Sequence, residues 1–203
     1  MDGEADCRKA FANVVDALLP GVGFPYNVFK DSWGNFLFFD ADAVFFGHFI
    51  WVVKDLLRIE SAHSACLVNL SRKSTTDFDE GACMCLHSET TTDQFQERIR
   101  AGGDGAWLSD ITDNYGCASD LGEWCIYCER QSEVAVIAIK RAELMKSIHV
   151  PLRMLGARPA ESLWKPEPPS LISKGGEEWR HRLTEHYTPS MEKEKFKWWA
   201  DGP

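Results

Sequence analysis

The chain has 203 residues, 44% hydrophobic and 26% charged, a mixture typical of a globular domain rather than a disordered or collagen-like chain. Its formal net charge of -9 argues against nucleic acid as a partner, because phosphate binding is driven by lysine and arginine. The longest apolar run, residues 43–53, is interrupted by Gly47 and His48 and is much shorter than the roughly 20 residues that cross a bilayer, so we expect no membrane partner.

The amino-terminal sequence and the cysteine content favour the cytoplasm. Residues 1–11 open with acids and lack the basic segment followed by an apolar one that marks a secretory signal. The seven cysteines are an odd number, and in a reducing compartment we expect them to be free and mostly buried.

Apolar periodicity predicts alternating helices and strands in the first half of the chain. In chain order it predicts a helix that ends at Pro20-Gly21, a strand at 35–40, a helix at 42–58, strands at 64–70 and 82–87, and a helix at 92–101. Thr91 and Gln94 stand at the spacing of a capping box, which marks the start of the last of these helices.

The clearest strand signal lies in residues 122–140, which read as two strands around a polar turn at 130–132. Both faces of the second strand are apolar, so it should be a central strand that is covered on both sides. A short helix is predicted to follow at 142–148.

These elements predict one α+β domain over residues 1–157, with a central, mostly antiparallel sheet packed against helices. Beyond residue 157 four prolines preclude regular structure until a possible helix at 177–187. We therefore assign residues 158–203 to a Pro-rich C-terminal extension.

Acidic side chains are concentrated between Thr75 and Glu133, where thirteen carboxylates stand against three arginines. One interpretation is solubility, because loops and exposed helix faces are commonly charged. The other is a docking surface for a basic protein, since opposite charge speeds encounter and interleaved aromatic side chains supply anchors. The candidate partner-binding residues are Asp77, Asp79, Glu80, Asp104, Trp107, Asp110, Asp113, Tyr115, Asp120 and Glu123.

Asp40 and Asp42 end the predicted strand at 35–40 and begin the helix after it. The pair resembles the first motif of haloacid-dehalogenase-type phosphohydrolases, in which Asp40 would be the nucleophile and Asp42 a general acid/base. It also resembles the Asp-x-Asp of nucleotide-sugar glycosyltransferases, whose carboxylates hold a divalent metal. The third interpretation is structural, with Asp42 capping the helix. The catalytic alternative is thus a small metal-dependent phosphohydrolase or nucleotide-sugar enzyme.

Cysteine and histidine side chains suggest a zinc site that the strand pattern disfavours. Cys83, Cys85 and His87 alternate along one strand and would face one side, where Cys125 and Cys128 could add thiolates. On a regular strand, however, Cys125 and Cys128 point to opposite faces. We therefore expect buried cysteines that pack as small hydrophobic residues, and no cofactor.

The portion from Trp107 to Lys140, above all GEWCIYCERQSEVAVIAIK, resembles small bacterial immunity proteins of polymorphic toxin systems. The shared features are an aromatic strand, a polar turn and a buried aliphatic strand. The resemblance implies a non-enzymatic cytoplasmic protein that binds a cognate toxin domain and blocks its active site or substrate surface. Many such toxins are basic nucleases, which an acidic inhibitor complements.

Overall fold

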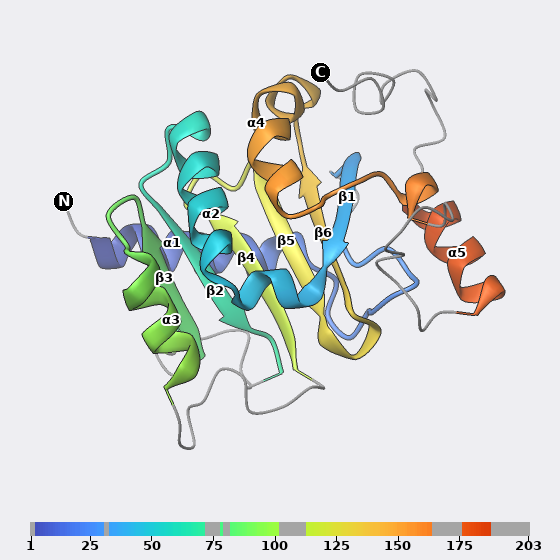
Figure 1. Ribbon diagram of the computed structural model, residues 1–203, viewed down its shortest axis with the longest axis horizontal. Helices are drawn as coiled ribbons and strands as arrows, with labels where there is room; N and C mark the ends of the chain where they lie inside the picture. Colours follow the sequence, from blue (N-terminus) through green and yellow to red (C-terminus); the bar gives the residue numbers. More distant parts are fainter. Residues whose placement is uncertain are drawn as a thin grey trace.

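A computed structural model describes residues 3–30, 33–71, 78, 82–101, 113–163 and 176–187. As the sequence predicts, the fold is α+β, with helices packed on an antiparallel sheet (Figure 1). The α-helices are α1 (Gly3–Ala17), α2 (Gly47–Glu60), α3 (Thr92–Arg100), α4 (Ala142–Met154) and α5 (Glu177–Tyr187). The strands are β1 (Asn35–Asp40), β2 (Ser64–Asn69), β3 (Cys83–His87), β4 (Asn114–Ser119), β5 (Trp124–Glu129) and β6 (Val134–Ile139). Short 3-10 helices are η1 (Ala41–Phe45), η2 (Arg130–Ser132) and η3 (Ala160–Ser162).

The six strands lie in the order β1-β6-β5-β4-β2-β3, and every neighbouring pair is antiparallel. All residues of β6 are buried between β1 and β5, which confirms the prediction of a central strand. At the β1 edge, the backbones of Phe38 and Arg158 exchange two hydrogen bonds of 2.7 and 2.9 Å. The chain after α4 therefore covers part of this edge.

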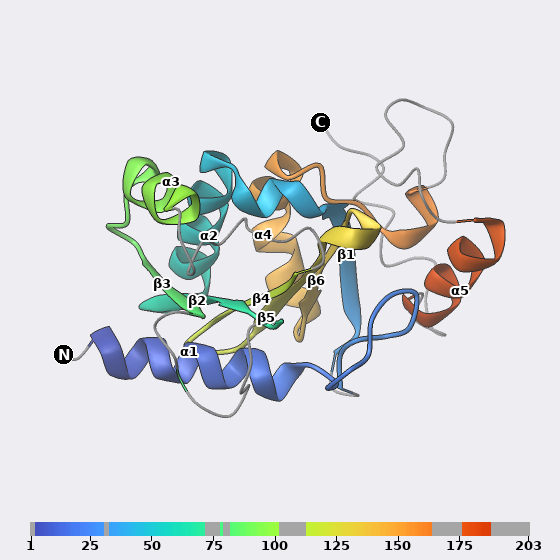
Figure 2. The same ribbon diagram turned by 90° about the horizontal axis from the view of Figure 1, so that it is seen from below.

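Helices cover both faces of the sheet, so the molecule has three layers (Figure 2). α2, α3 and α4 lie on one face, and α1 lies on the other. α5 joins the core on the α1 side through Leu183 and Tyr187. The Tyr187 hydroxyl accepts a hydrogen bond from Val28 N and donates one to Tyr26 O, both at 3.0 Å. The predicted helix of the C-terminal extension therefore packs on the domain.

The helix expected at 42–58 is divided in two. η1 ends at Phe45, and the extended backbone of Phe46 (φ -94°, ψ 153°) separates it from α2. α3 instead begins as predicted, because Thr91 Oγ1 accepts from Gln94 N and Gln94 Oε1 accepts from Thr91 N. The capping box satisfies two amides that lack a helical partner.

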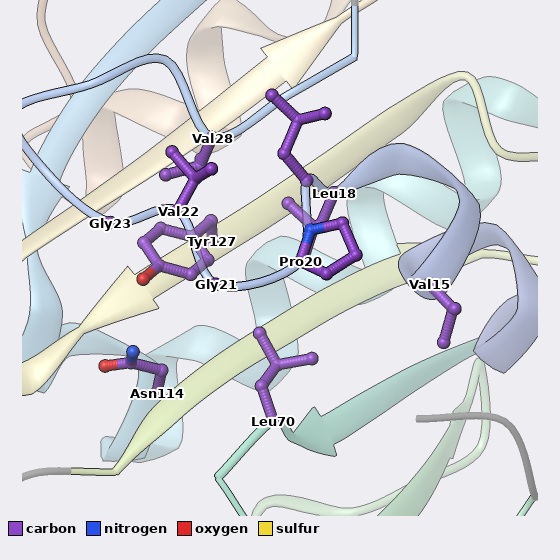
Figure 3. A pocket seen from close by; sticks show the side chains of 11 residues that line it. Val15, Leu18, Pro20, Gly21, Val22, Gly23, Val28, Leu70, Asn114 and Tyr127 are labelled. Atoms are coloured by element: carbon purple, nitrogen blue, oxygen red, sulfur yellow. The ribbon is translucent and has the colours of Figure 1, made fainter. Parts of the chain in front are cut away.

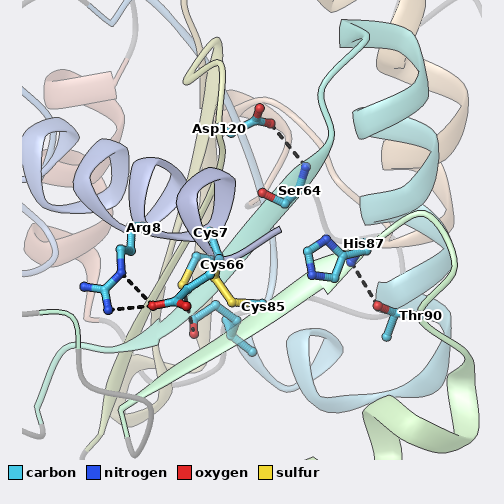
Figure 4. Close-up of a disulfide and its surroundings, with 10 residues drawn as sticks. Cys7, Arg8, Ser64, Cys66, Cys85, His87, Thr90 and Asp120 are labelled. Carbon is cyan, nitrogen blue, oxygen red and sulfur yellow. Dashed lines mark hydrogen bonds and ion pairs between the residues drawn. A yellow bond between two sulfur atoms is a disulfide. The ribbon is translucent and has the colours of Figure 1, made fainter. Parts of the chain in front are cut away.

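Cys7 and Cys85 form a disulfide that joins α1 to β3 (Figure 4). The prediction that all cysteines are free is wrong for this pair, because α1 packs across β2 and β3 and brings the Cα atoms within 5.7 Å. The other five cysteines are buried and form no disulfide, as predicted.

Candidate functional site

The strand register brings carboxylates that are far apart in the sequence to one end of the sheet. Asp40 pairs with Val134, Val134 with Glu129, and Glu129 with Asn114. η1 and η2 connect to strands at this same end, the lower end in Figure 1, and they add Asp42 and Glu133. We name Asp40, Asp42, Glu129 and Glu133 the acidic end of the sheet.

Asp40 is half-buried and serves as the cap of η1. Its Oδ1 accepts a hydrogen bond of 2.8 Å from Asp42 N. Burial raises the pKa of Asp40, and the negative charges of Asp42 and Glu133 add to this rise against the opposing effect of the hydrogen bond. The expectation that Asp42 is the cap is therefore wrong, because the residue that ends the strand performs this role.

Asp42 points toward Arg130. Its carboxylate is 62% exposed, and Oδ1 lies 3.8 Å from Arg130 Nε. The Arg130 side chain is only 16% exposed, and its guanidinium lies 5.0 Å from the centre of the Phe45 ring. Arg130 thus faces Asp42, while its own guanidinium packs against an aromatic ring. The catalytic hypothesis for Asp40 and Asp42 stays a prediction.

A cavity of about 520 Å³ opens beside the acidic end, between the C-terminal part of α1 and the ends of β4 and β5 (Figure 3). Its walls are mostly apolar, and Asn114 and Tyr127 supply polar groups. This combination is typical of sites that receive a ligand or an anchoring side chain. The lining residues are Val15, Leu18, Leu19, Pro20, Gly21, Val22, Gly23, Val28, Leu70, Asn114 and Tyr127.

Glu129 links the cavity to the acidic end. Its Oε2 accepts hydrogen bonds of 3.1 Å from the Tyr127 hydroxyl and from Phe24 N. A Cβ at Gly23 would lie 2.7 Å from this oxygen, so a side chain at this position would displace the Glu129 carboxylate. Burial, followed by the charge of Glu129, raises the pKa of Tyr127, and the neutral hydroxyl therefore remains a donor at neutral pH.

Three predicted partner-binding residues, Asp113, Tyr115 and Asp120, are buried, so they offer little surface for contact, and their role in binding stays a prediction. Asp113 accepts a hydrogen bond of 2.9 Å from Asn69 Nδ2, and the Tyr115 hydroxyl lies 3.4 Å from Asp113 Oδ2. Asp120 accepts from backbone amides at the start of β2. Glu123 is half-buried and pairs with Arg141. The carboxylates of Asp113, Asp120 and Glu123 bind donor groups within the chain, and a count of charges in the sequence could not reveal these contacts.

The other six predicted partner-binding residues, Asp77, Asp79, Glu80, Asp104, Trp107 and Asp110, lie outside the described residues. These six residues fall in two segments of the chain. Described residues beside the two segments, Ser71 and Asn114, contact each other at the cavity end of the sheet. Asn114 N donates to Ser71 Oγ at 2.9 Å, and Leu70 N donates to Asn114 O at 2.8 Å.

The zinc site that the strand pattern disfavours, at Cys83, Cys85 and His87 on β3, lacks one of its candidate ligands. The sulfur of Cys85 is bonded to Cys7, so it cannot act as a thiolate ligand. Cys83 is buried, and the half-buried His87 donates its backbone N–H to Thr90. Cys125 and Cys128 do face opposite sides of the sheet, as the strand pattern predicts.

Sequence reasoning included Glu129 and Glu133 in the acidic stretch but missed them as site residues. The available signal was their position on either side of the predicted turn at 130–132. Among the described residues, no helix is both long and apolar enough to cross a membrane. Comparisons of the chain with protein-family models, curated proteins and solved structures find no match.

Proposed function

We propose that this protein is a non-enzymatic binding protein of the immunity type, which binds a cognate basic toxin domain at the acidic end of the sheet. The observation that carries the proposal is the meeting of Asp40, Asp42, Glu129 and Glu133 at one sheet end, beside an apolar cavity.

The two parts of this surface would make different contributions to binding. The exposed Asp42 and the half-buried Asp40 and Glu133 attract a basic surface and speed its approach. The cavity can take an apolar side chain of the partner, and buried anchors of this kind supply much of the affinity of protein interfaces. Charge would therefore act mainly on the association rate, and the cavity on the dissociation rate.

The first experiment is titration calorimetry with the toxin domain encoded beside the gene for this chain. We expect calorimetry to show a 1:1 complex. In stopped-flow mixing, association should slow as salt rises, because salt screens exposed charges beyond about 10 Å at 0.1 M. The absence of both heat and protection of cells from the toxin would contradict the immunity assignment.

A pair of charge-reversal variants locates the surface. Asp42→Lys with Glu133→Lys should slow association by about tenfold or more at low salt. The matched control, Glu4→Lys with Glu143→Lys, makes the same change in net charge at exposed positions toward the other end of the sheet. Equal slowing in both pairs would show that net charge alone steers the partner, which would refute docking at the acidic end.

A further inference from the structure

Three side chains with metal-binding groups meet at the sheet end opposite the acidic end. Asp6 lies on α1, His63 precedes β2, and Asp120 follows β4. One ligand atom from each lies within 4.8 Å of the others. We propose that Asp6, His63 and Asp120 bind a divalent transition-metal ion of the Zn²⁺ class, and we name them the Asp-His-Asp site.

Asp120 is the fixed member of the site. The residue is 2% exposed, and its Oδ1 accepts a hydrogen bond from His63 N at 3.0 Å. The same oxygen accepts a hydrogen bond from Ser64 N at 3.2 Å (Figure 4). Its Oδ2 accepts no hydrogen bond from the part of the chain that the structure describes, and it faces His63 Nδ1 at 3.6 Å. One oxygen is thus used for structure, while the other is held toward the imidazole.

The separation of these two atoms fits a shared ion. Two ligands about 2.1 Å from Zn²⁺ at a tetrahedral angle lie about 3.4 Å apart. The observed 3.6 Å between His63 Nδ1 and Asp120 Oδ2 is close to this value. The ligand atom of the half-buried Asp6 lies within 4.8 Å of the other two, so it would move closer when the ion binds.

The position of α1 is fixed by a contact two turns after Asp6. Asn13 Nδ2 donates to the carbonyl oxygens of Ser119 at 2.9 Å and Asp120 at 3.1 Å. Gly122 closes this turn with φ +69°, and a Cβ there would lie 2.9 Å from the Asn13 amide. The helix that carries Asp6 is therefore anchored on the turn that carries Asp120, which lowers the entropic cost of assembling the ligands.

The ligand types define the class of ion. Two carboxylates and one neutral imidazole balance a charge of +2 and suit zinc and neighbouring first-row ions. Without an ion, Asp6 and Asp120 bring like charges together. The His63 side chain is 67% exposed, so a fourth coordination position is open to water or to a donor from another molecule.

The test is titration calorimetry of the oxidised full chain with ZnCl₂ in a buffer that does not bind zinc. We expect one ion per chain and a rise in the melting temperature, because a ligand that binds only the folded state stabilises it. Asp6→Asn and His63→Ala should each weaken binding at least tenfold, and His149→Ala, on α4, should leave it unchanged. Both ligand variants alter exposed or half-buried side chains, and circular dichroism will verify their folding.

Co²⁺ as a second probe separates this site from the free thiols. Coordination by the Asp-His-Asp site gives a spectrum without thiolate charge-transfer absorption, and Asp6→Asn abolishes that spectrum. Absence of binding would overturn the proposal. Binding that survives both ligand variants, or that shows thiolate absorption, would also overturn it, because cysteines would then hold the ion.

Discussion

At the scale of single residues, Glu60 has a side-chain carboxyl group that is buried in the fold. It is 8% exposed, and its Oε1 accepts a hydrogen bond of 2.9 Å from Glu123 N. Burial raises its pKa, while the polar groups of Ser119, Glu123 and Trp124 oppose the rise. A carboxyl whose pKa is raised on folding favours the folded state below its unfolded pKa, near 4.5, and this contribution is lost as pH rises through the folded pKa.

We therefore expect Glu60→Gln to increase stability at neutral pH relative to the natural chain and to have less effect near pH 4. The amide oxygen can still accept from Glu123 N, and no charge is buried. Thermal unfolding at both pH values measures the difference, with Glu97→Gln on the exposed face of α3 as the control. If the Glu60→Gln variant gained less stability over the natural chain at pH 7 than at pH 4, this account would be contradicted.

At the scale of elements, the packing of α1 on the sheet depends on Gly116 in β4. A Cβ at this position would lie 2.4 Å from Val14 Cγ1 and 3.4 Å from Leu18 Cδ1. Gly116→Ala should therefore lower the free energy of unfolding by about 1–3 kcal/mol, as overpacking does. Gly34→Ala is the matched control, because nothing lies within 4 Å of its added Cβ.

Denaturant unfolding of Gly116→Ala with and without Val14→Ala tests the cause. Shortening Val14 makes room for the new methyl group, so the double variant should be more stable than the sum of the two single effects implies. Strict additivity would show that the cost arises within β4 rather than at its contact with α1.

The elements that the sequence predicts well are those with a local signal. The capping box of α3 and the two-sided apolar pattern of β6 depend on neighbouring residues alone. β4 was not predicted, because Asn114, Gly116 and Ser119 have low strand propensity. Its hydrogen bonds to β2 and β5 and the close approach of α1 stabilise it, and these are contacts between distant parts of the chain.

At the scale of the whole molecule, the acidic surplus could be counted from the sequence but not placed. Among the described carboxylates between Thr75 and Glu133, some are buried, such as Asp113 beside Asn69, and others, such as Glu129, lie at the sheet end that also receives Asp40 from β1. Only the strand order decides which carboxylates become neighbours. The Asp-His-Asp site also depends on the strand order, because its residues come from distant parts of the chain. Asp6 lies on α1, His63 directly precedes β2, and Asp120 directly follows β4.

The disulfide between Cys7 and Cys85 provides the molecule-wide stability test, because it closes a loop with a sequence separation of 78. Loop-closure entropy for a link of this length corresponds to about 4 kcal/mol, and losing it should lower the melting temperature by about 10 °C. Replacing both cysteines with serine should produce this loss, and a reductant should produce it in the natural chain while leaving the double variant unchanged. A natural chain whose melting temperature is insensitive to the reductant would show that packing alone holds α1 on the sheet.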